Sequence, residues 1–442
     1  MANTFIHRTP SSASNRRTWT WSAWIKRSGL TSSSNGHTLW ETEGSNGGDN
    51  FIFQIKGSND TLHLHTYGND VFTTTRKLRD TSAWYHVVLA MDTTQGTAAN
   101  RIKLYLNGEL QTYSAAANFP SQNFEFGINK NHKHCIGSHG TNANYYFDGL
   151  MSHIHFCDGS ALAPTVFGET DSTTGEWKIK SSPSFTPGTN GYTVLKDGNT
   201  ITDQSANSNN FTSSGAGVTN TKDCPDNNFA TWNPLLIYVS EIPTFSEGNT
   251  KVSPTGNSSR NYAISTIAMP RTGKWYSEFK KLQNDNVMHI GILDTEIATA
   301  RFQANAYVKD NAGGIVYDSR NGTITGNNSI QQSGLASSGN GDIIGLAIDM
   351  DSSLFYVYKN GTLLNTSGTG VNFSSFITGS DVAFFVGDGS SSGYDSCQAN
   401  FGNGYFGTSA VSSAGTNASN NGIFEYNVPS GYTALSTKGL NL

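Results

Sequence analysis

Two Asn-Gly dipeptides constrain the fold of this chain most strongly, because each follows a run of alternating apolar and polar residues. The dipeptide at 107–108 follows the strand-like run 102–106, and the dipeptide at 360–361 follows the run 354–358. Both central residues of a tight hairpin turn need positive φ, which asparagine and glycine adopt most easily. The sequence therefore predicts one antiparallel hairpin in each half of the chain.

Other strand-like segments surround both hairpins, and long Ala/Leu/Glu/Lys segments with a helical period are absent. The predicted strands are 18–25, 51–55, 62–66, 84–91, 102–106 and 145–156 in the first half, and 274–279, 288–293, 343–350, 354–358, 382–386 and 397–401 in the second. Both halves contain the same hairpin pattern of a strand, an Asn-Gly turn and a return strand. We therefore predict an all-β chain of two antiparallel β-sandwich (jelly-roll) domains.

The amino-acid composition changes between the two series of predicted strands. Prolines and Thr/Ser/Asn/Gly clusters fill the middle of the chain and leave only short apolar runs there. Such a segment is typical of an irregular connection rather than of an independent core. We therefore predict a first sandwich over 1–164, an irregular connector over 165–229 and a second sandwich over 230–442.

Composition excludes several classes of function. Of the 442 residues only 14% are charged, and the formal net charge of −5 leaves no basic excess to hold a nucleic-acid backbone. No apolar stretch approaches the ~18 residues that a membrane span requires. The four cysteines are widely spaced and form no CxxC pair, so we expect free thiols rather than a zinc ribbon or a disulfide framework. The sequence predicts no cofactor, no nucleic-acid partner and no membrane insertion.

Short motifs in each half carry a resemblance to a known family. The first half resembles the laminin-G-like, concanavalin-A-type jelly roll through 22–26 (SAWIK), 84–88 (WYHVV), 104–108 (LYLNG) and 147–149 (FDG). The second half resembles a SPRY domain through 275–278 (WYSE), 341–349 (GDIIGLAID), 359–361 (KNG) and 400–402 (NFG). Both resemblances imply antiparallel sandwiches.

Two further motifs resemble segments that are common in structural proteins of tailed phages from marine bacteria. They are 203–211 (DQSANSNNF) and 226–234 (DNNFATWNP). The resemblance implies a virion protein that is assembled in the host cytoplasm, either a tail or fibre component or a capsid decoration. Its partners would be other virion proteins and host-surface glycan, and a homo-oligomer such as a trimer is compatible with this role.

Aromatic and acidic residues beside polar loops are the candidate carbohydrate-binding residues. Sugar rings stack their C–H faces on aromatic side chains, while their hydroxyls bond to amides and carboxylates. The residues that fit this pattern are Trp40, Tyr145, Tyr146, Asp388, Tyr394 and Asp395.

Ten of the 11 histidines precede residue 160, and six of them form pairs with HxH spacing. The pairs are His63/His65, His132/His134 and His153/His155. Residues i and i+2 of a strand point to the same face, so each pair could present two imidazoles to one metal ion. Two imidazoles fill only half of a tetrahedral site. We therefore predict a metal-free protein, and His63/His65 is the pair that we would assign if a metal were found.

Catalytic motifs are weak, and we predict a non-enzymatic protein. Glu41 and Glu43 have the i, i+2 spacing of paired glycosidase carboxylates but enter a Gly-rich loop. The stretch 389–393 matches GxSxG without the strand-to-helix turn that a nucleophile elbow needs. Two alternatives remain open: a virion-borne or secreted polysaccharide hydrolase of the concanavalin-A-like glucanase type, and an assembly protein that binds virion partners through its SPRY loops.

Overall fold

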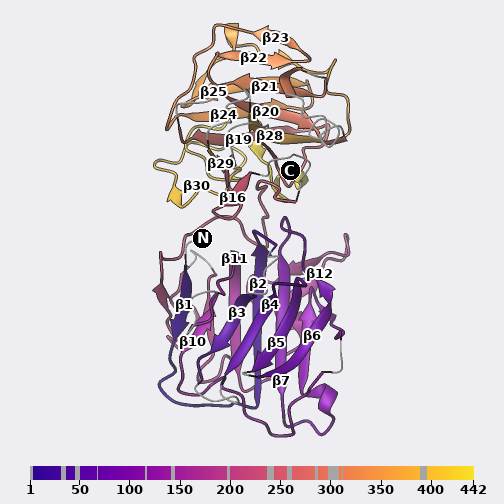
Figure 1. Ribbon diagram of the computed structural model, residues 1–442, viewed down its shortest axis with the longest axis vertical. Coiled ribbons are helices and arrows are strands. Elements are labelled where there is room, and N and C mark those ends of the chain that lie inside the picture. Colours follow the sequence, from indigo (N-terminus) through magenta and orange to yellow (C-terminus); the bar gives the residue numbers. More distant parts are fainter. Residues whose placement is uncertain are drawn as a thin grey trace. The chain divides into compact units, whose positions relative to one another are not determined.

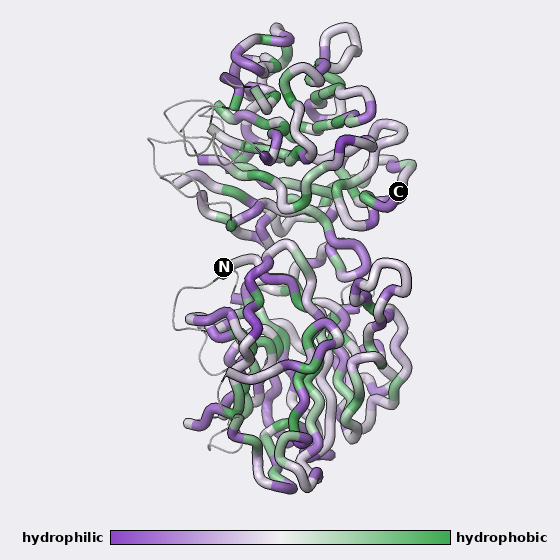
Figure 2. Tube along the Cα trace, turned by 90° about the vertical axis from the view of Figure 1, so that its right-hand side faces the viewer, coloured by the Kyte–Doolittle hydropathy of each residue, from purple (hydrophilic) through white to green (hydrophobic). Residues whose placement is uncertain are grey.

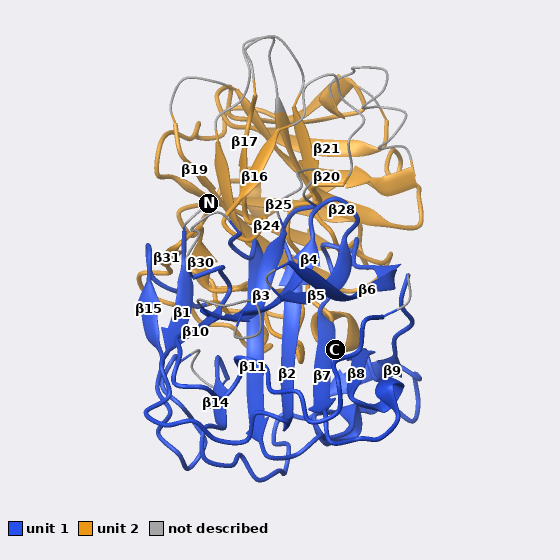
Figure 3. Ribbon diagram, turned by 60° about the horizontal axis from the view of Figure 1, so that its bottom comes forward, with its two compact units in different colours: residues 1–220 blue, residues 221–442 orange. Residues whose placement is uncertain are grey.

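The computed structural model describes residues 3–30, 36–44, 50–66, 68–114, 117–140, 145–196, 200–235, 243–255, 261–283, 287–296, 308–310, 312–388 and 396–442. The chain forms two compact units, residues 1–220 and residues 221–442 (Figure 3). Each unit is built from two large, mainly antiparallel sheets, which confirms the predicted all-β class (Figure 1). Hydrophobic residues gather along the strands, and the connecting turns are mostly hydrophilic (Figure 2).

The first sheet of unit 1 has seven strands. In spatial order they are β15 (Thr212–Ser214), β1 (Phe5–Arg8), β10 (His134–Ile136), β3 (His37–Thr42), β4 (Phe51–Lys56), β5 (Thr61–Thr66) and β6 (Asn69–Lys77). The second sheet has six strands: β14 (Tyr192–Val194), β11 (Gly149–Asp158), β2 (Thr18–Arg27), β7 (Tyr85–Asp92), β8 (Ile102–Leu106) and β9 (Glu109–Leu110). A separate hairpin joins β12 (Gly168–Thr170) to β13 (Trp177–Ile179).

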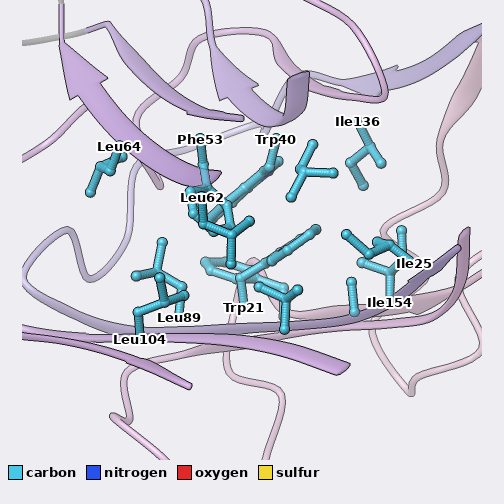
Figure 4. Close-up of a cluster of buried hydrophobic side chains, with 14 of the residues drawn as sticks. Trp21, Ile25, Trp40, Phe53, Leu62, Leu64, Leu89, Leu104, Ile136 and Ile154 are labelled. Atoms are coloured by element: carbon cyan, nitrogen blue, oxygen red, sulfur yellow. The ribbon is translucent and has the colours of Figure 1, made fainter. Parts of the chain in front are cut away.

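The core of unit 1 lies between these two sheets and is rich in aromatic rings. Trp21 of β2 stacks on Trp40 of β3, with ring centroids 5.7 Å apart and an interplanar angle of 7° (Figure 4). Trp19 meets the edge of Trp40 at 5.4 Å. Alternation along β2 explains this arrangement, because every second residue of a strand faces the opposing sheet.

Both predicted Asn-Gly turns are confirmed. Asn107 and Gly108 have φ of 48° and 81°, and Asn360 and Gly361 have φ of 48° and 79°. The first turn joins β8 to β9, and the second joins β25 (Leu354–Lys359) to β26 (Thr362–Leu363). In each turn both central residues are left-handed, as a two-residue hairpin with the right-handed strand twist requires.

The segment 165–229, expected as an irregular connector without a core of its own, is divided between the two units. Strand β14 pairs with β11, and β15 pairs with β1, so both extend the sheets of unit 1. Residue Phe229 bridges to Ser436 within unit 2. Three-residue strands contain too little alternation to be predicted, and only their distant partners define them.

Unit 2 also has two large sheets. The spatial order of the first sheet is β16 (Thr244–Ser246), β17 (Lys251–Ser253), β29 (Cys397–Asn400), β19 (Lys274–Lys281), β24 (Ile343–Asp349), β25 and β26. Two further strands join it at the side: β27 (Val371–Asn372) pairs with β25, and β32 (Thr433–Ala434) pairs parallel with β19. The second comprises β18 (Tyr262–Ile264), β28 (Val382–Asp388), β20 (Met288–Asp294), β21 (Gly314–Asp318), β22 (Thr323–Gly326) and β23 (Ser329–Gln332). A small hairpin joins β30 (Tyr405–Phe406) to β31 (Ser409–Ala410).

Short 3₁₀ turns complete the regular structure of the described chain: η1 (Ala98–Asn100), η2 (Pro164–Val166), η4 (Val308–Asp310), η5 (Thr366–Gly368) and η6 (Gly439–Asn441). No helix in the described ranges is long and apolar enough to cross a membrane. All four cysteines are free thiols.

Candidate functional site

The outer face of the seven-stranded sheet carries a row of polar side chains that the sequence places on strands far apart. Gln54 of β4 lies opposite His63 of β5, and His65 lies opposite Asp70 of β6. These four residues and His139, from the segment after β10, are named the histidine face below. The register of β4 and β5 places Gln54 beside the two histidines, and a register shift between Leu64 and His65 places Asp70 of β6 opposite His65.

Hydrogen bonds fix the two imidazoles of the histidine face. The Gln54 amide nitrogen lies 3.3 Å from Nδ1 of His63 and 3.3 Å from Nε2 of His65. Because this amide group donates two hydrogens, both ring nitrogens act as acceptors. Nε2 of His63 then carries the ring hydrogen and donates it to Oδ1 of Asp70 over 3.0 Å. The two rings are stacked with centroids 4.8 Å apart.

This network bears on the metal assignment that the HxH pattern suggested. Both nitrogens of His63 are engaged, one by Gln54 and one by Asp70, so a metal ion would have to displace a hydrogen-bond partner. Within the described ranges no group of three or more His, Cys, Asp or Glu side chains is arranged to hold a metal. The arrangement is a hydrogen-bonded network in which the buried His63 lies between Gln54 and Asp70, and the exposed Asp70 carboxylate forms its outer end.

Burial keeps these histidines neutral. It lowers the pKa of His65 to about 4, and the neighbouring His63 ring lowers it further while Asp70 acts in the opposite direction. Burial also lowers the pKa of His63. The side chain of Asp70 is 65% exposed, so the carboxylate at the edge of the network is accessible to solvent.

The other two HxH pairs are structural. A β-bulge separates Ser152 from His155, and His153 has φ of 48°, so His153 and His155 do not share a face. Their ring centroids are 6.4 Å apart at 60°. His134 is buried and accepts the backbone N–H of Asn129 over 3.1 Å, which uses its Nε2.

A buried carboxyl lies beside the histidine face. Glu41 of β3 is 0% exposed, accepts the backbone N–H of Gly140 on Oε1 over 2.6 Å, and has Oε2 3.3 Å from Nδ1 of His139. Burial raises the pKa of Glu41 to about 8, against the effect of the Gly140 hydrogen bond. The carboxyl is therefore mostly protonated at neutral pH, as desolvation of an acid dictates.

The second acidic residue of this motif has a different environment. Glu43 is half-buried and pairs with Lys133, whose Nζ lies 3.0 Å from Oε1. A side chain at position 140 would clash with Glu43, because a Cβ there would lie 2.4 Å from Oε1. A larger residue at 140 would therefore require the side chains of Glu43 and Cys135 to move.

The structure separates the residues that the sequence predicted for carbohydrate binding. Tyr145 and Tyr146 are half-buried; Tyr145 lies 5.6 Å from the ring of His139, which places it beside the histidine face. Tyr146 lies 6.3 Å from the ring of Phe5 on β1. The backbone N–H of Thr38 donates a hydrogen bond of 3.0 Å to the carbonyl of Tyr145. This bond, rather than a hairpin turn, holds the segment with the two tyrosines against the sheet.

The expectation for Trp40 is wrong. Its side chain is 0% exposed and lies in the core between the two sheets of unit 1, so it cannot stack on a sugar. Residues Tyr394 and Asp395 lie outside the described residues, and so does the side chain of Asp388, whose backbone ends β28. The serine motif at 389–393 also lies outside the described residues.

Sequence analysis missed Gln54, Asp70 and His139, the partners that define the histidine face. The register of the β4–β5 hairpin could have identified Gln54, because the two strands are joined by a short turn and their paired residues follow from it. Asp70 gives no such signal, because register shifts interrupt the pairing of β5 with β6. His139 gives no such signal, because it lies in a loop.

The motifs at 203–211 and 226–234 contain residues with structural roles. Asp203 is buried, and its Oδ1 accepts the backbone N–H groups of Thr193 and Ser205 over 2.8 Å each. This carboxylate therefore fastens β14 to the loop that follows it. Asn227 donates from its amide to Oδ1 of Asn421 over 2.9 Å within unit 2.

Comparison with known families assigns a domain to each unit. A model of the concanavalin A-like lectin/glucanases superfamily matches residues 5–166, and a model of the SPRY domain matches residues 274–404. The chain therefore carries a concanavalin A-like domain followed by a SPRY domain, as the sequence resemblance implied. Together these domains indicate a binding or protein-interaction role.

Solved structures similar to this chain include the SPRY domain of human HERC1, at 14% identity over 38% of this chain and 96% of that one, with a TM-score of 0.28. A native heptameric SAP-like pentraxin from Limulus polyphemus is similar at 19% identity over 36% of this chain and 71% of that one, with a TM-score of 0.27. The comparison with curated proteins finds no match.

Proposed function

We propose that this protein is a non-enzymatic structural component of a tailed-phage virion that binds host-surface glycan or neighbouring virion proteins. The phage role rests on the resemblance of segments 203–211 and 226–234 and on the tandem of the two domains. It would be a tail or fibre component or a capsid decoration, assembled in the host cytoplasm.

The histidine face is the observation that carries the binding function. Its imidazoles and amide hold one another in fixed tautomers, and the half-buried ring of Tyr145 and the exposed carboxylate of Asp70 adjoin them. Such a pre-organised group of donors, acceptors and ring edges suits a polar ligand with apolar C–H faces, because little side-chain entropy is lost on binding. A saccharide has this chemistry.

A polysaccharide hydrolase is the second candidate function, and one observation favours it. Glu41 is mostly protonated because burial raises its pKa, whereas Glu43 is paired with Lys133. General acid catalysis of glycoside hydrolysis needs a carboxyl that is protonated at neutral pH, with a second carboxyl nearby. Against this role, Glu41 is 0% exposed and lies under Gly140, so a glycosidic oxygen has no access to it in this conformation.

The first experiment separates binding from catalysis. Purified protein is incubated with surface polysaccharide of the bacterium that the phage infects, and both retention and release of reducing ends are measured. Binding without release supports the proposal. Release that disappears in Glu41→Gln or Glu43→Gln would instead establish the hydrolase.

A second experiment assigns the site and the location. Tyr145→Ala should weaken adsorption to host cells about tenfold through loss of one ring contact, whereas Tyr105→Ala, a half-buried tyrosine on β8 of the other sheet, should leave adsorption unchanged. Antibodies against the chain should label purified virions in immunogold electron microscopy. Unlabelled particles would contradict the virion role.

A further inference from the structure

The guanidinium group of Arg27 lies in the interior of unit 1 with one edge unpaired. Arg27 is the last residue of β2, and its fully buried side chain points to the same side of the strand as the core residues Trp21 and Ile25. Nη1 donates to Oδ1 of Asp60 over 2.9 Å and also to the carbonyl of Leu78. Nε and Nη2 are buried and have no hydrogen-bond partner in the described chain. These two nitrogens are named the open edge of Arg27 below.

Another arginine of unit 1 shows how such a group is normally satisfied. Nε of Arg101 donates to the carbonyl of Gln95 over 2.8 Å. Its Nη1 and Nη2 donate to the carbonyls of Pro120 and Gly96 over 2.7 and 2.9 Å. All three nitrogens of Arg101 are therefore bonded, although this side chain is only half-buried. Because an unpaired donor costs most where water has no access, the open edge of Arg27 requires a partner.

His37, the first residue of β3, adds a second unpaired group near the open edge. Burial lowers the pKa of His37 to about 4, and the neighbouring Arg27 lowers it as well. The ring is therefore neutral at neutral pH. Its Nδ1 is buried and has no hydrogen-bond partner within the described ranges. A neutral imidazole donates from Nδ1 when Nε2 is unprotonated, so His37 can supply a further N–H.

The charge of Arg27 is only partly balanced by its ion pair with Asp60. Oδ2 of Asp60 also lies 3.1 Å from Nε of Arg79, so two guanidinium groups share this carboxylate. Burial raises the pKa of Asp148, whereas the nearby Arg27 lowers it, but no ion pair joins the two residues in the described chain. Asp80 is exposed. One positive charge is therefore left without a carboxylate in contact.

We infer that a small carboxylate anion binds at the open edge of Arg27, with one oxygen on Nε, the other on Nη2, and Nδ1 of His37 as a further donor. The Nε and Nη2 groups point in parallel, and their spacing matches the two oxygens of a carboxylate. The anion supplies the missing negative charge. Because Arg27 is fully buried, the ligand is limited to the size of formate or acetate. This inference goes beyond the proposed function and does not depend on it.

Water and chloride are the competing occupants of this position. A water molecule accepts hydrogen bonds but brings no charge to the two guanidinium groups that share Asp60. Chloride brings the charge, but a spherical ion does not match two parallel N–H groups. A carboxylate satisfies both the charge and the geometry of the open edge.

The test measures binding of radiolabelled formate to the full chain by equilibrium dialysis, with unlabelled acetate and chloride as competitors. We expect a single formate per chain, displaced by acetate better than by chloride. The melting temperature of unit 1 should also rise with formate concentration, relative to sodium chloride at equal ionic strength, because the ligand binds the folded state.

Variants assign the binding to the open edge. Arg27→Lys keeps the charge but replaces the paired donors with one ammonium group, so the affinity for formate should fall about tenfold or more. His37→Phe keeps an aromatic ring and removes Nδ1, so it should weaken binding by a smaller factor and guards against misfolding of the Arg27 variant. Arg101→Lys is the matched control and should bind formate like the unaltered protein. Circular dichroism and thermal melting check the fold of every variant.

The other outcomes overturn the inference in distinguishable ways. Equal binding of formate to the unaltered protein, Arg27→Lys and His37→Phe would place the anion elsewhere. Displacement by chloride as effectively as by acetate would make the position a halide site. Binding to Asp148→Asn but not to the unaltered protein would show that Asp148 turns toward Arg27 and is itself the partner. Binding to none of these proteins would leave the open edge to water.

Discussion

The indole N–H of Trp177 donates a hydrogen bond of 3.0 Å to Nδ1 of His86. Because an indole nitrogen is only a donor, Nδ1 of His86 is unprotonated and Nε2 carries the ring hydrogen, which faces Oγ of Ser22 at 2.9 Å. The Trp177 ring also lies against Gly108 and Gly168, where a Cβ would come within 2.6 and 2.5 Å of it. The β12–β13 hairpin is thereby fastened to the outer face of the six-stranded sheet.

Trp177→Phe keeps an aromatic ring and removes the donor to His86. The buried Nδ1 is then left without a partner, so we expect the free energy of unfolding of unit 1 to fall by about 1–3 kcal/mol. Urea denaturation followed by circular dichroism measures this change. Glu176→Gln, at an exposed neighbouring position, is the control and should change stability by less than about 0.5 kcal/mol. An unchanged midpoint in Trp177→Phe would show that the hydrogen bond contributes nothing net.

Asparagine has the same role in the turns of both units. Asn107 donates its N–H to the His86 carbonyl and accepts the His86 N–H on Oδ1, each over 2.8 Å. Asn360 makes the same two bonds with Ile343, over 2.8 and 2.9 Å. The side chain therefore matters in addition to the tolerance of asparagine for positive φ.

Glycine and alanine variants separate these two contributions. Asn107→Gly loses only the amide, which we expect to cost about 1 kcal/mol, whereas Asn107→Ala also strains the left-handed backbone and should cost about 1–2 kcal/mol more. Chemical denaturation should show the losses in the transition of unit 1, and the same substitutions at Asn360 should affect unit 2. Equal stability of the glycine and alanine variants would contradict the backbone argument.

Acidification should destabilise unit 1. Burial lowers the pKa of His37, His65 and His134 to about 4 and that of His86 to about 3. Each of these histidines has a lower pKa in the folded state than in the unfolded chain, where it is near 6.5. Their contribution to the free energy of unfolding is therefore fully present above pH 6.5 and is lost as the pH falls toward 4. We expect the melting temperature of unit 1 to fall between pH 6.5 and 4, and calorimetry across this range measures it. His86→Gln should flatten the dependence.

Unit 2 should respond to pH in the opposite direction over part of this range. Burial raises the pKa of Glu278 to about 7, although its hydrogen bonds to the backbone of Glu425 and Tyr426 act against this. In the unfolded chain the pKa of this glutamate is near 4.5. Its contribution to the free energy of unfolding is therefore fully present below pH 4.5 and is lost as the pH rises through about 7. The melting transition of unit 2 should therefore rise as the pH falls from 7 to 5. Glu278→Gln should remove this dependence, and a transition that falls in parallel with that of unit 1 would contradict it.

Limited proteolysis should cut the chain close to residue 220 and release two folded fragments. The boundary lies between Gly217, whose carbonyl accepts the Thr4 hydroxyl in unit 1, and Lys222, whose N–H bonds to Asn403 in unit 2. A fragment of residues 1–164 should be much less stable than one of residues 1–220, because it lacks β14 and β15. Mass spectrometry of the fragments and their thermal melting check both statements. Equal stability of the two fragments would show that the added strands are dispensable.

Local sequence determined the hairpins and the strand alternation of both units. Asn-Gly has few conformations that avoid steric strain, so its turn type follows from two residues, and it fixes the register of the strands that it joins. The motifs for a concanavalin A-like and a SPRY domain lie largely in such strand-and-turn segments, which is why both could be identified before any coordinates.

Tertiary structure alone decided which faces are buried and which side chains meet. A register shift between Thr38 and Trp40 turns Trp40 into the core, so alternation along this strand gave no guide to its exposure. The short strands β14 and β15 exist because they pair with β11 and β1, more than 30 and 200 residues earlier in the chain. The buried Glu278 of β19 joins the sheet to the C-terminal segment by accepting the backbone N–H groups of Glu425 and Tyr426, about 150 residues later in the chain. A turn depends only on its own backbone, so the sequence could predict it. Contacts between distant segments depend on the complete packing of the sheets, so the sequence could not predict them.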